Sequence, residues 1–142
     1  MKDKVFLKKV DNNQLDFEVL YELLKNRKFN ISNKKTPSFK DHIKFVKKNS
    51  YRAWYLAMFN NDYVGSIYLK NDNSIGINFK NKYRNKIPFF LEKILNKHKP
   101  LKKIPSERNG NFFINIANGD EKTKKILLDF GLIHIQSTFL IK

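Results

Sequence analysis

A basic loop between a predicted strand and a predicted helix is the part of the chain best suited to chemistry. The strand is expected over residues 74–79, the loop over 80–86 and an amphipathic helix over 88–98. The first turn of a helix presents backbone N–H groups and the positive end of the helix dipole, and both favour an anion. Arg84 in the loop could add a charge-assisted contact. The segment therefore predicts an anion-binding site.

The elements that must position this segment follow from the spacing of apolar residues and from turn signals. Helices are expected over 15–26, over 39–49 and from a cap at Asp120 to Gly131, with a polar loop over 29–35. The predicted strands are 5–10, 51–59, 63–69, 74–79, 112–116 and 132–141. The expected order is β-α-α-β-β-β-α-β-α-β, in a single domain over residues 1–142.

The net charge of +16 raises the question of nucleic acid as a partner. Lysine supplies 25 of the 29 basic residues, and no run of lysines is longer than two. Proteins that read nucleic acid favour arginine for bidentate contacts, so nucleic-acid binding is disfavoured. A solvated lysine surface and a surface that gathers a small anionic ligand both stay open. A hydrophobic content of 41% is ample for a core.

The element order and the basic loop resemble the GCN5-related N-acetyltransferase (GNAT) superfamily over almost the whole chain. In that family a loop of the form Arg-x-x-Gly-x-Gly/Ala cradles the pyrophosphate of coenzyme A (CoA). Arg84 stands at the first position here, whereas Ile87 and Phe89 stand at the two small-residue positions. The resemblance implies an α+β fold with three layers, α/β/α, around a mixed and mostly antiparallel sheet.

Segment 112–132 resembles a second signature of the family, in which a helix starts near Asn-x-x-Ser and ends in Gly-Phe. Asp120 and Thr123 stand at the first pair of positions, Gly131 is where the family has glycine, and Leu132 replaces the phenylalanine. The position at which the family often carries a proton-donating tyrosine falls on Leu127. The resemblance therefore extends to the second helix of the cofactor site but not to its usual proton donor.

The resemblance implies acetyl-CoA or another acyl-CoA as the cofactor and no metal. The pantetheine arm is expected along the fourth strand and the pyrophosphate at backbone N–H groups of residues 84–89, of which Pro88 donates none. The Cβ atoms of Ile87 and Phe89 could crowd the approach that glycine permits. The cofactor-binding residues implied are Ile77, Asn78, Phe79, Arg84, Asn85, Lys86, Ile87, Phe89, Asp120 and Thr123.

An acid–histidine pair, Asp41 and His42, resembles a weaker pattern of GNAT enzymes that acylate amino sugars on nucleotides. Residues 52–56 and 65–67 also look like that subgroup. The substrate-binding residues implied are His42 and Tyr55. The alternative for His42 is a partly exposed helix residue without a role in binding.

A general base is not evident, because strand 74–79 contains no Asp or Glu. The remaining candidates for catalysis are His42, Tyr68 and His134, with Tyr55 beside them. His134 stands among alternating apolar residues, where a histidine more often faces solvent or a satisfied core position. An amine substrate with a lowered pKa could react through water alone, so the catalytic residue stays open.

The leading interpretation is a CoA-dependent N-acyltransferase that acetylates a small primary amine, with an amino sugar on a nucleotide as one candidate. The rival interpretation is a catalytically inactive GNAT-like domain that binds or assembles without normal CoA binding. Ile87, Phe89 and Leu127 motivate this rival. The leading interpretation implies a small-molecule amine substrate as the partner, and a homodimer is left open.

The sequence contains no cysteine and only three scattered histidines, so it offers neither a disulfide nor the ligand spacing of a metal site. The first residues lack the apolar run of a signal peptide, and no apolar stretch reaches the length of a spanning helix. We therefore expect a cytoplasmic protein with no membrane partner.

Overall fold

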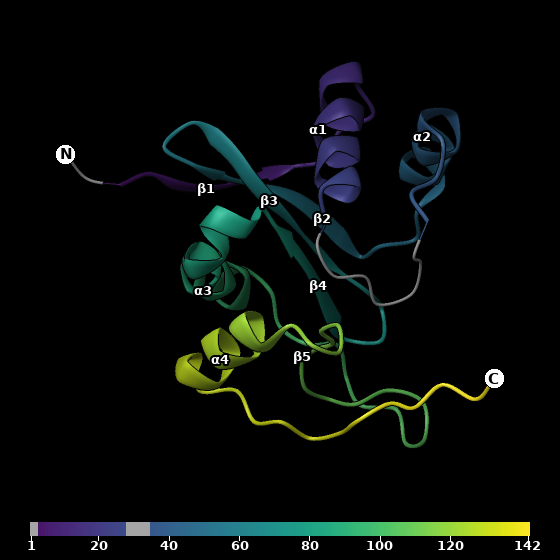
Figure 1. The fold of residues 1–142 in the computed structure, drawn as a ribbon. Coiled ribbons are helices and arrows are strands. Elements are labelled where there is room, and N and C mark those ends of the chain that lie inside the picture. The colour runs from purple at the N-terminus through teal and green to yellow at the C-terminus, as the bar shows by residue number, and fades with distance from the viewer. Residues whose placement is uncertain (1–2, 28–34) are drawn as a thin grey trace.

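The computed structural model describes residues 3–27 and 35–142, and its centre is a five-stranded sheet (Figure 1). The strands lie in the order β1-β2-β3-β4-β5, and only the contact between β4 and β5 is parallel. The sheet is therefore mixed and mostly antiparallel, as predicted. The loop predicted for 29–35 falls almost wholly outside the described residues. The strand bounds are β1 Val5–Lys9, β2 Ala53–Phe59, β3 Asp62–Leu69, β4 Ser74–Phe79 and β5 Phe113–Ile114.

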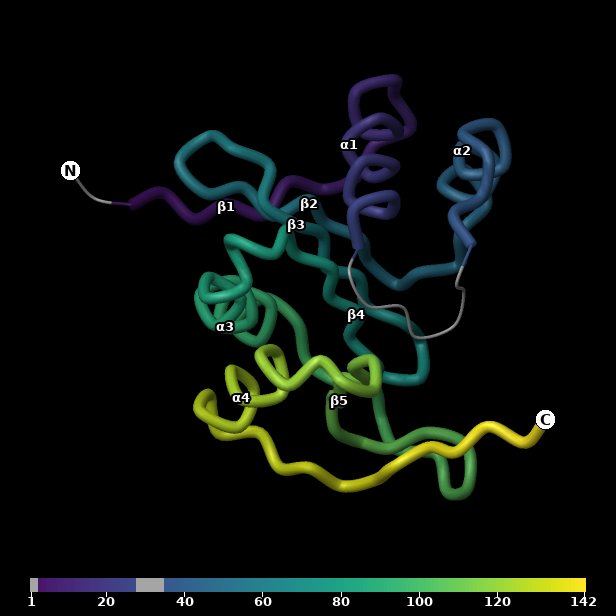
Figure 2. Tube along the Cα trace, viewed as in Figure 1, coloured from purple at the N-terminus to yellow at the C-terminus, as the bar shows by residue number. Residues whose placement is uncertain are grey.

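Helices cover both faces of the sheet, which gives the three predicted layers (Figure 2). One face carries α1 Gln14–Lys25 and α2 Phe39–Lys48, and the other carries α3 Ile87–Lys97 and α4 Glu121–Phe130. A 3₁₀ helix, η1 Asn81–Lys86, leads directly into α3. The predicted α+β, three-layer fold is confirmed.

Alternation along the strands divides the core between the two faces. Tyr55 and Ala57 in β2 join the larger apolar cluster, which includes α3 and α4. Leu56, which lies between them in the sequence, is fully buried in the smaller cluster against α1 and α2. Both faces of the sheet are therefore apolar, and each is covered by a pair of helices.

Three helices begin at side-chain caps, of which the one at Asp120 was expected from the sequence. Asn13, Ser38 and Asp120 each accept a hydrogen bond from the backbone N–H three residues later, at 2.9, 3.2 and 3.2 Å. Helix α4 ends at Gly131, whose φ of 111° lies in the left-handed region that glycine adopts without strain. These local signals fix where the three helices begin and where α4 ends.

Two predicted elements differ in the structure. Residues 80–86, expected as a loop, are mostly the 3₁₀ helix η1, so that helical backbone begins about six residues before α3. The strand predicted over 112–116 is paired only at Phe113–Ile114, because β5 departs from β4 after two residue pairs.

The last strand predicted, over 132–141, is wrong for the folded chain. No part of this segment has strand structure, and it runs from the end of α4 along the outside of the molecule (Figure 1). A strand requires a neighbour that pairs with its N–H and C=O groups, and among the described residues none lies alongside. The apolar alternation that suggested a strand is therefore left without a partner.

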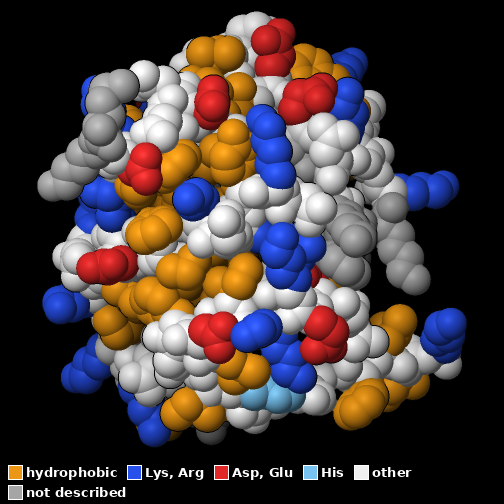
Figure 3. All heavy atoms as spheres, turned by 60° about the vertical axis from the view of Figure 1, so that its left-hand side comes forward, with side chains coloured by type: hydrophobic (Ala, Val, Ile, Leu, Met, Phe, Trp, Pro, Cys, Tyr) orange, Lys and Arg blue, Asp and Glu red, His pale blue; other side chains and the backbone are white. Residues whose placement is uncertain are grey.

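Lysine and arginine side chains are scattered over the face shown in Figure 3, with Asp and Glu between them, rather than gathered into one patch. In the described part of the chain no helix is long and apolar enough to cross a membrane. Within the same ranges no three His, Cys, Asp or Glu side chains cluster as metal ligands.

Candidate functional site

Strands β4 and β5 part after the pairs Ser74–Phe113 and Ile75–Ile114 and leave an opening in the sheet. The carbonyl of Asn73 accepts a hydrogen bond from the N–H of Phe113, at 3.2 Å. Since backbone groups alternate between the two sides of a strand, those of residues 75, 77 and 79 also face this side. Beyond the two pairs, the described chain provides no strand that could pair with residues 77 and 79. Their N–H and C=O groups therefore face the opening.

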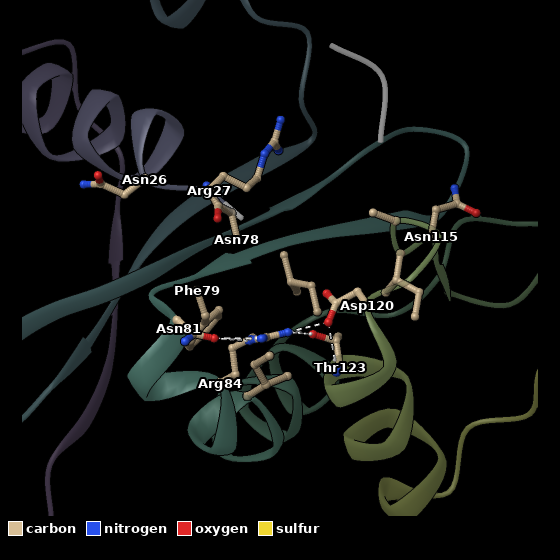
Figure 4. A pocket seen from close by; sticks show the side chains of 13 residues that line it. Asn26, Arg27, Asn78, Phe79, Asn81, Arg84, Asn115, Asp120 and Thr123 are labelled. Atoms are coloured by element: carbon tan, nitrogen blue, oxygen red, sulfur yellow. Dashed lines mark hydrogen bonds and ion pairs between the residues drawn. The ribbon is translucent and has the colours of Figure 1, made fainter. Parts of the chain in front are cut away.

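A narrow cleft occupies this opening, and its walls come from four parts of the chain (Figure 4). Residues 77–79 of β4 form one wall, and residues 115–117 after β5 form the other. Arg84, Asp120 and Thr123 lie at the end nearest α3 and α4, and Asn26 and Arg27 lie at the end of α1. The cleft therefore passes through the sheet from the α3–α4 side to the α1–α2 side.

Arg84 is the charged centre of the cleft, and its guanidinium is held by three side chains. Its Nη1 donates to Oδ1 of Asp120 and to Oγ1 of Thr123, the latter at 3.2 Å. Its Nε and Nη2 donate to Oδ1 of Asn81, at 3.2 and 2.7 Å. The side chains of Arg84 and Asp120 are only 10% and 13% exposed. The positive charge predicted to meet a pyrophosphate is thus already balanced by a carboxylate.

The backbone at the start of α3 is also partly engaged. The N–H of Ile87 donates to the carbonyl of Arg84, as the i→i+3 pattern of a 3₁₀ helix requires. Pro88, in the first turn, has no N–H. The first turn of the combined helix lies instead at residues 81–83, where the N–H of Tyr83 donates to the carbonyl of Lys80. The positive end of the helix dipole therefore starts several residues before the position that the sequence suggested.

The predicted cofactor residues separate into two groups. Seven line the cleft: Ile77, Asn78, Phe79, Arg84, Ile87, Asp120 and Thr123. Asn85, Lys86 and Phe89 do not line it. Phe89 is 49% exposed, and the Lys86 ammonium lies 4.7 Å from the centre of the Phe59 ring and 5.7 Å from that of Phe89. Ile87, in contrast, is 1% exposed and belongs to both the core and the cleft wall.

His42 lies between α1 and α2, outside the cleft. Its side chain is buried, and its Nε2 is 3.1 Å from the carbonyl oxygen of Phe17, to which it donates in the neutral form. Tyr21 and Phe39 pack against the imidazole ring. Burial lowers the pKa of His42, against the opposing effect of the hydrogen bond to Phe17. These contacts are those of a packed core histidine.

Tyr55 and His134 also lie outside the cleft. Tyr55 is on the α3 side of the sheet, where its hydroxyl is 2.8 Å from Nε2 of His98. Burial lowers the pKa of His98, and the nearby Arg52 and Lys97 lower it further. His134 is exposed, with its Nε2 2.8 Å from the carbonyl of Gln136.

Tyr68 lies on the α1–α2 side of the sheet and reaches over β4. It is opposite Gly76 in the register, and its Cζ is 2.0 Å from the point where a Cβ on Gly76 would stand. Its ring therefore lies over β4 at Gly76. Tyr51 stacks on Tyr68 with ring centres 4.1 Å apart, and burial together with this neighbour raises the pKa of Tyr51. None of the three catalytic candidates is among the residues that line the cleft, and of the three Tyr68 is the one whose ring lies over β4.

Sequence reasoning missed part of the cleft, namely Asn26, Arg27, Asn81 and residues 115–117. Asn81 had a local signal, because it lies three residues before Arg84 and three-residue neighbours meet on a helix. Asn26 and Arg27 had none, since the approach of the end of α1 to β4 is a property of the tertiary structure.

Comparisons with known proteins agree on the architecture. No protein-family model and no curated protein sequence matches the chain. Among solved structures, the aminoglycoside N-acetyltransferase AAC(6')-Iy in complex with CoA superposes with a TM-score of 0.64 at 9% identity, over 100% of this chain and 96% of that one. The fold is the GNAT fold.

Two further solved structures superpose on this chain. A domain from Methanocaldococcus jannaschii superposes with a TM-score of 0.67 at 15% identity, covering 96% of this chain and 93% of that one. A dodecameric spermidine N-acetyltransferase from Vibrio cholerae gives a TM-score of 0.55 at 15% identity, over 93% and 81%. The opening between β4 and β5 thus belongs to a GNAT-fold scaffold.

Proposed function

We propose that the protein is a CoA-dependent N-acyltransferase acting on a small primary amine. The observation that carries this proposal is the parting of β4 and β5, which turns the backbone groups of residues 77 and 79 toward a cleft that crosses the sheet. An acyl-CoA carries amide groups along its pantetheine arm, and an exposed strand edge can pair with such amides without help from side chains. The fold neighbours include a CoA complex and N-acetyltransferases, which supports the proposal.

The residues present fit the pantetheine arm of the cofactor better than they fit its pyrophosphate. Ile77 and Phe79 would hold the arm through their backbone groups. Lys80 and Lys82, which are exposed at the start of η1, offer positive charge to phosphates together with the first N–H groups of that helix. In this proposal Arg84 has a structural role: its hydrogen bond to Asp120 holds η1 against the start of α4 at one end of the cleft.

The cofactor, when bound, supplies an acyl thioester. The cleft would orient it by the strand edge and exclude water with Ile77 and Ile87. We assign the amine to the α1–α2 side, where Tyr51, Trp54 and Tyr68 present a cluster of rings. Such rings suit a sugar or a base, so an amino sugar on a nucleotide is our candidate acceptor. The Tyr68 hydroxyl is the group we assign to proton transfer.

Calorimetry with acetyl-CoA, followed by thiol release in the presence of a panel of amines, tests this function. The chain contains no cysteine, so a thiol reagent reports free CoA without background from the protein. We expect saturable binding, with Tyr68→Phe keeping the affinity and lowering turnover. Absence of binding at millimolar acetyl-CoA would overturn the proposal.

A second candidate function, a GNAT-fold domain that binds or assembles without catalysis, is favoured by a separate observation. The cavity volume of the partly open cleft is about 70 Å³, which is small beside the roughly 300–1,000 Å³ of typical small-molecule sites. Together with the engaged guanidinium of Arg84, this leaves little room for a cofactor unless the walls part. Enlarging the cleft separates the two candidates, as the Discussion describes.

A further inference from the structure

Asp120 occupies the position in the cleft at which an anionic ligand would meet Arg84 (Figure 4). One of its carboxylate oxygens, Oδ1, accepts a hydrogen bond from Nη1 of Arg84 and another from the backbone N–H of Thr123, the latter at 3.2 Å. A guanidinium and a backbone N–H in the first turn of a helix are also the donors that proteins use to bind a phosphate oxygen. The carboxylate therefore holds donors that would suit a phosphate.

The charge of Asp120 is the one that an entering anion would meet in the cleft. Among the described residues that line the cleft, Asp120 is the only acid. Asn81 and Thr123, which also accept hydrogen bonds from Arg84, are neutral. The side chains of Asp120 and Arg84 are mostly buried, so solvent screens their charges less than it does at the surface. A phosphate at Arg84 must therefore displace the carboxylate or bind beside a like charge, and both are unfavourable.

The start of α4 does not require this charge. Asp120 is the N-cap of α4, and asparagine, aspartate and serine cap helices about equally well. The amide oxygen of an asparagine can accept the N–H of Thr123 as a carboxylate oxygen does, and it also accepts from a guanidinium, as Oδ1 of Asn81 does from Arg84. What only the aspartate supplies is the negative charge. A single substitution therefore separates the effect of that charge from the effect of the cap.

The elements that border this end of the cleft otherwise carry positive charge. Lys82 in η1 and Lys122 in the first turn of α4 are exposed, and neither forms an ion pair within the described part of the chain. Exposed lysines attract anions over a distance. The innermost contact, at Arg84, is made by Asp120 instead. Asp120 is thus the group that decides whether a phosphate gathered at this surface reaches Arg84.

We propose that Asp120 is a specificity-determining residue of the cleft, which excludes diphosphate-bearing ligands from Arg84 by taking the place of a phosphate. The strand edge at residues 77 and 79 does not involve this ion pair, so a pantetheine arm can still pair with it. The cleft therefore selects an acyl donor by its arm, and a diphosphate adds nothing to the affinity. The statement about acyl donors rests on the proposed function, whereas the statement about diphosphate at Arg84 does not.

Calorimetry with inorganic pyrophosphate on the full chain tests the role of the charge. We expect Asp120→Asn to bind pyrophosphate about tenfold more tightly than the wild type, because Arg84 then lacks its carboxylate. The matched control is Glu121→Gln, which removes a neighbouring carboxylate that is exposed and lies outside the cleft, and which changes the net charge by the same amount. Equal affinity of the wild type and Asp120→Asn, or an equal gain in Glu121→Gln, would overturn the proposal.

A comparison of two ligands on the wild type does not rely on the folding of any variant. We expect S-acetylpantetheine, which lacks the diphosphate, to bind no more weakly than acetyl-CoA, and tighter binding of acetyl-CoA would contradict the proposal. If the wild type binds neither, the proposed acyl transfer fails, and the pyrophosphate measurement alone decides the role of Asp120.

The folding of Asp120→Asn is itself informative, because Arg84 then lacks its counter-ion. If the variant is unfolded on its own, pyrophosphate should restore its circular dichroism spectrum by supplying the missing anion. A variant that stays unfolded in pyrophosphate would count against the proposal.

Discussion

Arg84 and Asp120 form an ion pair that joins η1 to the N-cap of α4 across 36 residues of sequence. The same carboxylate accepts a hydrogen bond from the N–H of Thr123 and so begins α4. The Asp120 side chain therefore has two structural roles. It caps the start of α4, and it holds α4 in position against α3. Since both helices border the cleft, the pair sets the shape of the end of the cleft nearest α3 and α4.

Replacing Arg84 by methionine should destabilise the protein, because Asp120 would then be a mostly buried carboxylate without its cation. Loss of one partner of a buried pair costs 3–5 kcal/mol, and partial exposure reduces this to about 2 kcal/mol here. Urea unfolding followed by circular dichroism measures the change. The control is Lys125→Met, which removes the 77% exposed partner of Asp129 and should cost less than about 0.5 kcal/mol. Equal effects of the two substitutions would contradict the prediction.

Replacing Gly76 by alanine should displace Tyr68, whose Cζ lies 2.0 Å from the new Cβ. Overpacking of this kind costs typically 1–3 kcal/mol, so we expect about 2 kcal/mol in unfolding free energy. The cost should fall to within about 0.5 kcal/mol when Gly76→Ala is measured in a Tyr68→Ala background, because the clash is then absent. A cost that is the same in both backgrounds would show that the ring does not occupy this position.

How far the sequence predicted the fold depends on how local each signal was. Strand 74–79 and the cap at Asp120 were predicted because the deciding residues are neighbours in sequence. The 3₁₀ helix over 81–86 was missed because its lysines and asparagines show no apolar periodicity, and Pro88 suggested a later helix start. The strand over 132–141 failed for another reason, since alternation predicts the capacity to pair but does not supply the partner.

The candidate site shows the same division. Ile77, Arg84 and Asp120 were grouped through the resemblance to a family, and the structure brings all three to one cleft. What the sequence did not contain is the state of Arg84, whose charge is balanced by Asp120 within the fold. His42 was singled out because the Asp41–His42 pair resembles a pattern of one GNAT subgroup, whereas its partners Phe17 and Tyr21 could be found only from the packing of α1 on α2.

Enlarging the cleft at Ile87 should distinguish an enzyme from an inactive domain. Ile87→Ala removes a buried side chain and should cost about 3 kcal/mol in stability, while it widens the wall near Arg84. If the native protein binds acetyl-CoA, we expect Ile87→Ala to bind it more weakly, because the wall of the cleft is then less well packed. If affinity appears only in the variant, the native cleft is closed to the cofactor. Phe89→Ala is the control, because Phe89 is 49% exposed outside the cleft and its loss should change neither affinity nor stability by much.

His42 should make the protein less stable in mild acid. Burial lowers its pKa below the ordinary value of 6.5, so the unfolded chain binds a proton at a pH where the folded chain does not. Its contribution to stability is therefore fully present above about pH 6.5 and is lost as the pH falls toward the folded pKa. His42→Gln can still donate to the carbonyl of Phe17 but does not titrate. We expect the difference in unfolding free energy between wild type and variant to shrink from pH 7.5 to about pH 5, as measured by urea unfolding at each pH.

His98, whose pKa is also lowered by burial, is present in both proteins and cancels in this comparison. His134→Gln provides the matched control, because it makes the same substitution at an exposed histidine. A wild type and a His42→Gln variant that lose stability in parallel would show that the imidazole accepts a proton without breaking its contact with Phe17. In that case the packing of α1 on α2 would not depend on the neutral form of His42. Any loss of unfolding free energy in mild acid would then have to come from other groups in the chain.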